Sequence, residues 1–360
     1  MTGCMWSANF GALTDGLYEQ EVGQQDSGTS QWNGIVDEFR QPVVTKSKYQ
    51  SRLELEAETK DLDDEDEDEA TGVSEIRFWS DYSRVFYHPR TSQRLPDVAD
   101  YEHADGDWVS GRDAFTKYNE ETELMEDSFR FFVEECDNPQ GLQVINDTAS
   151  FGSFTHSFLS AFRDDFTKLP CWTFSLLSDS VPGSLNVDEP RGIAKAVNDA
   201  LCLQSLNELS TLNVPIQSPL AWESGPWLED ITLKRDAPYH TSSVLATHIE
   251  SITLPFRVGA PAIPVPTSFP RYFTSGPTPS TLSSFATLST TTRTAILFTQ
   301  YAKFMDECTK QYAHVVQQMG LEMDDVKDLR DTLRALEDEY RGDDHTFDSD
   351  DNDEGLGEDE

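Results

Sequence analysis

The residues best suited to chemistry lie in "NDTASFGSFTHS", residues 146–157, between an expected strand and an expected helix. A loop in that position is a common place to hold a nucleotide phosphate. Glycines there let backbone N–H groups approach the phosphate, and the helix end adds partial positive charge. Gly152 could allow one close approach, and hydroxyl groups beside it could donate hydrogen bonds. The candidate phosphate contacts are therefore Ser150, Gly152, Ser153 and Thr155.

The same stretch departs from a phosphate-binding loop in several ways. Its single glycine is flanked by Phe151 and Phe154, and no lysine follows it as in a P-loop. Asp147, just upstream, would repel a phosphate unless a metal ion intervened. The preferred interpretation is that Ser150 or Ser153 caps the helix while the phenylalanines pack below. We therefore expect no cofactor, with a bound nucleotide as the alternative.

Other residue patterns indicate no catalytic residues and no metal site. Asn198 and Asp199 could read a guanine edge, but a polar pair on the outer side of a helix is the preferred interpretation. The histidines show no HExxH spacing, and no G-x-S-x-G is present. The 5 cysteines contain no CxxC and are typical of reduced thiols, several of them in apolar surroundings.

Around the candidate loop, hydrophobic periodicity predicts an α/β arrangement. Strand, helix and strand follow one another over 142–178, which favours a parallel βαβ unit with a right-handed crossover. The expected strands are 76–80, 84–87, 142–147, 171–178 and the segment "ITLPFR" that ends at 257; the expected helices are 120–136, 153–166, 193–212 and the segment that begins at 239.

The C-terminal part is expected to be helical. Apolar spacing predicts a helix over 294–319 that ends at Gly320, followed by a second helix capped by Asp324 or Asp325. The second helix carries an apolar seam of about two heptads. The predicted organisation is an α/β domain over 1–257 with an acidic insert at 58–73, a Pro/Ser/Thr-rich loop over 258–293, C-terminal helices over 294–341 and an acidic disordered tail over 342–360.

The charge of the chain limits its partners. The formal net charge is −39, and removing the acidic runs at 61–69 and 343–360 still leaves acidic residues well in excess of the 27 basic ones. An acidic body argues against direct nucleic-acid binding and against an anionic membrane surface. It suits basic protein partners or simply solubility. No apolar run reaches 18 residues, so we expect no transmembrane segment.

Two long stretches resemble a known family. "FWSDYSRVFYHPRTSQRLPD" and "EDSFRFFVEECDNPQGLQVINDTASFGSF" are similar to the Misato family of tubulin-like proteins, and the resemblance extends from about Phe10 to about Gln318. It implies that the α/β domain expected over 1–257 is a tubulin-like parallel sheet flanked by helices. The fungal members are implicated in inheritance of mitochondria and mitochondrial DNA. The resemblance implies that the chain starts beyond the family's usual first strand and glycine-containing loop.

The resemblance also implies a mode of action. Tubulin-like GTPases complete hydrolysis with an Asn-x-Asp-x-x-Glu helix, and the corresponding helix here has only Glu250. We therefore expect a non-enzymatic protein that acts through other proteins, located in the cytoplasm and on the outer, cytoplasmic side of the mitochondrion, with peripheral association. The alternatives are a GTP-binding switch or weak GTPase, and an adaptor that docks through residues 294–341.

Overall fold

The chain is described by a computed structural model at residues 5–7, 51, 92–95, 108–185, 189–222, 233–235, 237–254, 263–264, 281–282, 288 and 291–341. The expected strands at 76–80 and 84–87, the acidic insert 58–73 and the acidic tail 342–360 lie outside these residues, as does most of 258–293.

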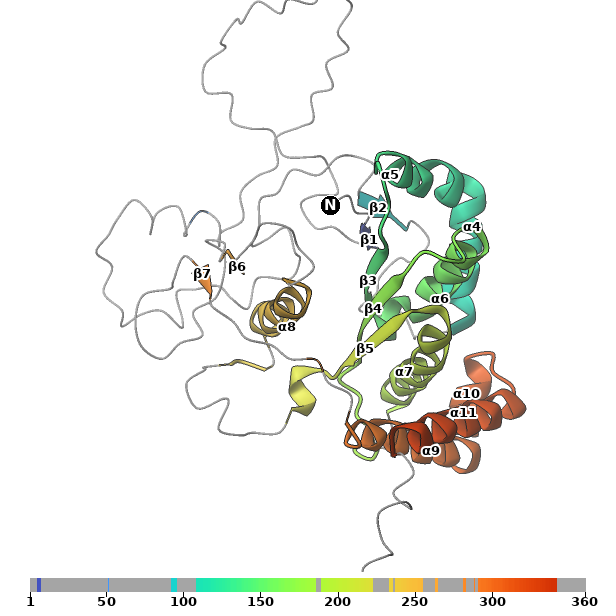
Figure 1. The fold of residues 1–360 in the computed structure, drawn as a ribbon. Helices are drawn as coiled ribbons and strands as arrows, with labels where there is room; N and C mark the ends of the chain where they lie inside the picture. The colour runs from blue at the N-terminus through green and yellow to red at the C-terminus, as the bar shows by residue number, and fades with distance from the viewer. Residues whose placement is uncertain are drawn as a thin grey trace, which may run out of the picture.

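A three-stranded parallel sheet forms the centre of the described structure. Its strands are β3 (Leu142–Asp147), β4 (Cys171–Leu176) and β5 (Leu212–Ile216), in the order β3-β4-β5. The crossover helices α6 (Thr148–Asp165) and α7 (Pro190–Leu209) lie on the same face of the sheet, as right-handed crossovers between sequential strands require (Figure 1). The α/β fold class and the first two strands are confirmed.

The third strand was missed by the sequence analysis. The helix expected to end at 212 ends at Leu209, and β5 begins at Leu212. Pro215 lies within β5, opposite Ser175 of β4. Proline cannot donate to a sheet ladder and argues against a central strand, so the sequence pattern concealed this element.

An aromatic layer holds α6 between the sheet and a preceding helical segment. Phe158 and Phe162 are fully buried, and both meet Phe129 edge to face at ring-centroid distances of 5.4 and 5.8 Å. The helix predicted over 120–136 is in fact interrupted, because Glu123 adopts a left-handed conformation with φ 50°. The segment consists of α4 (Trp108–Thr122), a π-helical turn η5 (Leu124–Phe129) and α5 (Arg130–Glu134).

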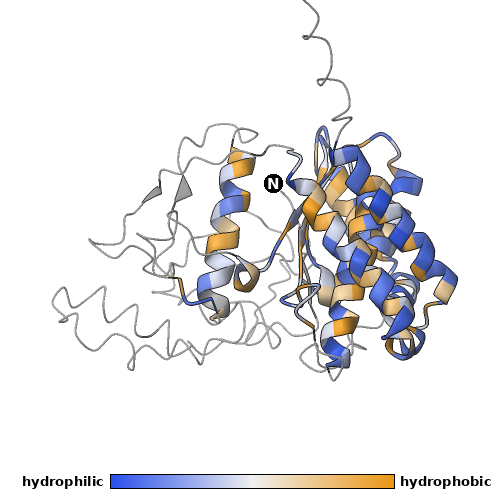
Figure 2. Cartoon of the chain, turned by 90° about the horizontal axis from the view of Figure 1, so that it is seen from below, coloured by the Kyte–Doolittle hydropathy of each residue, from blue (hydrophilic) through white to orange (hydrophobic). Residues whose placement is uncertain are grey.

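A second helical layer packs against α7 (Figure 1). It contains α9 (Thr294–Lys310), α10 (Ala313–Gln318) and α11 (Met323–Arg341). Hydrophobic residues gather inside the packed helices, and hydrophilic residues lie on the outer side (Figure 2). The predicted seam of α11 is buried at Val326, Leu329, Leu333 and Leu336.

The predicted helix over 294–319 is two helices, because Tyr312 leaves the helical conformation and packs its ring 6.2 Å from that of Phe304. The predicted stop at Gly320 is confirmed. Gly320 has φ 77°, and the N–H of Leu321 donates to the carbonyl of Val316. Asp325 caps the next helix by accepting from the N–H of Glu322 at 3.0 Å.

The opposite face of the sheet is contacted by α8 (Pro238–Thr253), where Ile249 packs with Phe174 and Val214. The strand expected at "ITLPFR" is wrong where the structure describes it, since α8 continues through Thr253. None of the described helices is both long and apolar enough to cross a membrane. The remaining short elements are β1 (Met5–Ser7) paired in parallel with β2 (Ser92–Arg94), the 3₁₀ turn η6 (Pro219–Ala221), and β6 (Ile263–Pro264) paired antiparallel with β7 (Thr281–Leu282).

Candidate functional site

The junction between β3 and α6 contains no loop. β3 ends at Asp147 and α6 begins at Thr148, so the expected loop residues form the first turns of a helix. Asp147 is the N-cap, and its carboxylate accepts from the N–H of Ala149 at 3.1 Å. The predicted cap at Ser150 or Ser153 is therefore wrong. The pair Asn146-Asp147 at the end of an apolar strand is itself an N-cap signal, which could have indicated the earlier start.

Gly152 is a packing residue in the helix interior. A Cβ built on it would lie less than 3.0 Å from Sγ of Cys202 on α7 and 3.3 Å from Cζ3 of Trp108 on α4. Real Cβ contacts are essentially never that close to a neighbouring atom, so only glycine fits without a shift. Gly152, which was expected to allow a phosphate to approach, instead allows the side chains of Cys202 and Trp108 to pack closely against α6.

The hydroxyl candidates point to protein partners. The Ser153 hydroxyl donates to the carbonyl of Trp108, and the Thr155 hydroxyl donates to Oδ1 of Asn146 at 2.8 Å. Both residues are buried. Ser150 is half-buried, and its hydroxyl donates to the Asp147 carboxylate. The four candidates are neighbours along one helix, but they do not converge on a shared open surface.

A buried carboxyl group joins this junction to the next one. Asp199 on α7 is fully buried and accepts hydrogen bonds from the N–H and hydroxyl of Ser178, the latter at 2.6 Å. It also bonds the Thr148 hydroxyl at the start of α6 and the Tyr301 hydroxyl on α9, the latter at 3.0 Å. The predicted placement of Asn198 and Asp199 on an outer helix side is wrong, because both side chains are buried. Asp199 faces the end of β4 and the start of α6, and the Asn198 amide donates to the carbonyl of Ala149 at 3.2 Å.

Burial dominates the electrostatics of this cluster. It raises the pKa of Asp199 to about 6, although the hydrogen bonds from Ser178, Thr148 and Tyr301 favour the ionised form. Burial and the neighbouring Asp199 also raise the pKa of Tyr301 and that of Cys202 well above their ordinary values. Tyr301 and Cys202 therefore stay protonated at neutral pH, and Asp199 is the group in the cluster that titrates near it.

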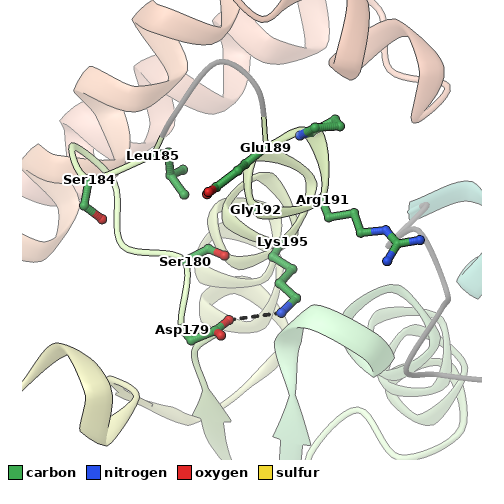
Figure 3. Close-up of a pocket in the computed structure, with 9 residues that line it drawn as sticks. Asp179, Ser180, Ser184, Leu185, Glu189, Arg191, Gly192 and Lys195 are labelled. Atoms are coloured by element: carbon green, nitrogen blue, oxygen red, sulfur yellow. Dashed lines mark hydrogen bonds and ion pairs between the residues drawn. The ribbon is translucent and has the colours of Figure 1, made fainter. Parts of the chain in front are cut away.

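The junction between β4 and α7 is open. A crevice of about 570 Å³ lies between the end of β4 and the start of α7 (Figure 3). Lys195 points toward Asp179 and pairs with it at 3.1 Å. Ser180 is 8% exposed and lines the crevice, with Oγ 3.5 Å from where a Cβ on Gly192 would lie. The lining residues are Asp179, Ser180, Ser184, Leu185, Glu189, Pro190, Arg191, Gly192 and Lys195.

This crevice combines groups that can hold an anion. Pro190 is the first residue of α7, so the N–H groups of Arg191 and Gly192 lie in the first turn of a 20-residue helix. Arg191 and Lys195 add cationic side chains, while Asp179 and Glu189 oppose them. This segment lies between the strand expected to end at 178 and the helix expected to begin at 193, so the sequence analysis assigned no element or site to it. The signal it missed is "EPRG", in which proline starts a helix and a cation and a glycine follow.

No group of three or more His, Cys, Asp or Glu suited to a metal ion occurs among the residues the structure describes. The described cysteines are free thiols, and Cys171, Cys202 and Cys308 are buried. Burial raises the pKa of the Cys171 thiol to about 11, which keeps it protonated at neutral pH.

A family model described as "Tubulin domain" matches residues 69–258, which is more than half of the chain. The chain is therefore a tubulin-domain protein, in agreement with its parallel sheet flanked by helices. "Protein DML1" of Gibberella zeae is 32% identical over 260 residues, covering 69% of this chain and 47% of that protein. "Protein DML1" of Phaeosphaeria nodorum is 33% identical over 193 residues, covering 52% of this chain and 36% of that protein.

The similarity extends beyond fungi. "Protein misato homolog 1" of Macaca fascicularis is 32% identical over 201 residues, covering 51% of this chain and 33% of that protein. The chain belongs to the tubulin-like Misato/DML1 family, as the resemblance of its sequence predicted. It spans about half the length of curated fungal relatives that it matches.

Proposed function

We propose that this protein acts in the inheritance of mitochondria and mitochondrial DNA as a non-enzymatic tubulin-like protein, through contacts with other proteins. Its membership of the Misato/DML1 family supports the cellular role. The packing of Gly152 against Cys202 is the single observation that supports a non-enzymatic mode, because it occupies the place where a phosphate loop would need open backbone.

The proposed location is the cytoplasm and the outer, cytoplasmic side of the mitochondrion, with peripheral association. The strongly acidic composition supports basic protein surfaces as partners, because opposite charge steers association and suppresses contact with other acidic surfaces. The same acidity supports the absence of direct nucleic-acid contact, so mitochondrial DNA would be affected through the organelle.

Depletion of the protein in its own cells tests this role. We expect a fall in mitochondrial DNA copies per nuclear genome and a rise in daughter cells that receive few mitochondria. Re-expression should rescue both, and so should the Lys195→Glu variant, whose altered crevice is not needed by a non-enzymatic protein. Unchanged mitochondrial DNA and unchanged partitioning after depletion would contradict the role.

A second candidate function is a GTP-binding switch or weak GTPase of the tubulin type. The observation that favours it is the crevice at the β4–α7 junction, with Arg191, Lys195 and the α7 N-terminus beside an open volume. Nucleotide phosphates bind at such helix ends when cations and small residues surround them.

Thermal unfolding with and without Mg²⁺ and GTP distinguishes the two candidates. A nucleotide at 100 times its dissociation constant stabilises a protein by about 2.7 kcal/mol, which raises the Tm measurably. If the second candidate holds, the rise disappears in Lys195→Glu and persists in Lys310→Glu, which changes a lysine in the last turn of α9. If the first holds, GTP leaves the Tm of all three chains unchanged.

A further inference from the structure

The Asp199 cluster connects the C-terminal helices to the sheet. Asp199 receives hydrogen bonds from the start of α6, the end of β4 and α9, three elements far apart in the sequence. Tyr301, the contribution of α9, is 3% exposed. Because Tyr301 covers the carboxyl group on the side of α9, detachment of α9 would expose Asp199 to water.

The hydrogen-bond geometry leaves room for a proton on Asp199. The Thr148 hydroxyl lies 2.9 Å from the carbonyl oxygen of Leu176 and also bonds Oδ1 of Asp199. A hydroxyl has one proton, and the Leu176 carbonyl can only accept. When Thr148 donates to Leu176, a proton on Asp199 allows the carboxyl group to donate to Thr148, and both contacts are satisfied.

The side chains around Asp199 do not supply a positive charge that would neutralise its carboxylate. The titratable neighbours are Tyr301 on α9 and Cys202 on α7, with Asp147 beside Cys202 at the start of α6. All of these become negative when they lose a proton. The nearest cation on the adjoining turn, Lys195, pairs with Asp179. Among the described residues, no basic side chain donates a hydrogen bond to Asp199.

We propose that Asp199 is a proton-linked latch: in mildly acidic solution it binds a proton, and the protonated side chain holds α9, with α10 and α11, more firmly on the sheet than the carboxylate does. The ionised form remains buried in neutral solution at the cost of its lost hydration. Detachment of α9 returns the carboxyl group to water, where it ionises freely. Protonation therefore favours the attached state, and rising pH favours opening.

Hydrogen exchange of the full chain tests the latch. Amide exchange in residues 294–310 is measured at pH 5.0 and pH 7.5 and corrected for the intrinsic effect of pH. For a carboxyl group whose pKa is about 6 when covered and ordinary when exposed, opening should be about tenfold rarer at pH 5.0 than at pH 7.5. The Asp199→Asn side chain cannot ionise, so the corrected ratio of opening at pH 7.5 to opening at pH 5.0 should fall to about one in that variant.

Asp306→Asn is the matched control on the same helices. Asp306 lies on α9 and bonds Arg330 and Arg334 of α11, so its loss should speed exchange at both pH values and keep the ratio near tenfold. If Asp199→Asn fails to fold, carboxyl carbon NMR of the wild-type chain still decides. A resonance with a midpoint near 6 is expected. Equal ratios in wild type and Asp199→Asn, or no aspartate titrating above about 5, would overturn the latch.

Discussion

The two strand–helix junctions at the carboxyl end of the sheet have opposite characters. The β3–α6 junction has the serines, threonine and glycine that suggest a phosphate loop, yet helix packing and internal hydrogen bonds use all of them. The β4–α7 junction looks ordinary in the sequence, yet it borders a crevice with two cationic side chains and a helix N-terminus.

The comparison shows that the role of a glycine depends on the atoms that surround it in the folded structure. Gly152 faces the thiol of Cys202 and the indole of Trp108, which belong to two other helices. A Cβ on Gly192 would lie 3.2 Å from the flexible end of Leu185 and 3.5 Å from Oγ of Ser180, and its other near atom belongs to the nearby Glu189. The first glycine permits close helix packing. The second leaves backbone accessible beside an open volume.

The largest effect should come from filling the closed junction. Gly152→Val places a branched side chain against Cys202 and Trp108, and we expect a loss of about 3 kcal/mol in the free energy of unfolding, since overpacking a core forces backbone shifts. The midpoint of urea unfolding measures this loss.

Gly192→Ala is the matched change at the open junction, and it should alter the free energy of unfolding by no more than about 0.5 kcal/mol. Adding Cys202→Ala to Gly152→Val should recover about 1 kcal/mol, because the two positions share one contact. Equal losses in Gly152→Val and Gly192→Ala would remove the distinction between the junctions.

An intermediate effect should come from the residue that ties both junctions to α9. Tyr301→Phe removes one hydrogen bond to Asp199 and keeps the ring, so we expect a loss of about 2 kcal/mol at pH 7.5, where the acceptor is mostly ionised. The pKa of Asp199 is raised to about 6, above its unfolded value of 3.8. Its contribution to stability is therefore fully present below pH 3.8 and is lost as pH rises through 6.

The cost of Tyr301→Phe should be smaller at pH 5.0, where the carboxyl group is neutral and its hydrogen bonds are weaker. Chemical unfolding of both chains at the two pH values measures the difference. A cost independent of pH would argue against a titrating Asp199 in this contact.

The smallest effect should separate the two helix starts. Asp147→Ala removes the cap of α6 and should cost about 1 kcal/mol. Glu189 occupies the equivalent position before α7 without a side-chain cap hydrogen bond, so Glu189→Ala should cost less than about 0.5 kcal/mol. Thermal unfolding of the two variants measures the difference. We expect a lower Tm for Asp147→Ala than for Glu189→Ala, and the reverse order would contradict the assigned caps.

Local periodicity predicted most of the central elements. Phe154, Phe158 and Phe162 of α6 and the leucines of the α11 seam repeat at helical spacing and are buried in the structure. The family resemblance predicted the fold class. The interruption at Glu123 could not be anticipated in this way, because the apolar spacing from Met125 onward continues through the π-helical turn and conceals the change in backbone.

The site could be predicted only in part, because its properties depend on contacts between distant segments. Nothing near Asp199 in the sequence indicates that Tyr301, 102 residues away, will cover it. Likewise, the tight space around Gly152 is set by Cys202 and Trp108 from other helices. Sequence spacing identified polar residues able to contact a phosphate, and tertiary packing decided which of them remained accessible.

A calorimetric titration of the full chain with Mg²⁺ and GTP tests the central claim most directly, namely that the β3–α6 junction is closed by packing and holds no nucleotide. We predict no binding at micromolar GTP in the wild-type chain. A dissociation constant of micromolar or tighter that is unchanged in Lys195→Glu would place the nucleotide away from the β4–α7 crevice and would contradict the claim.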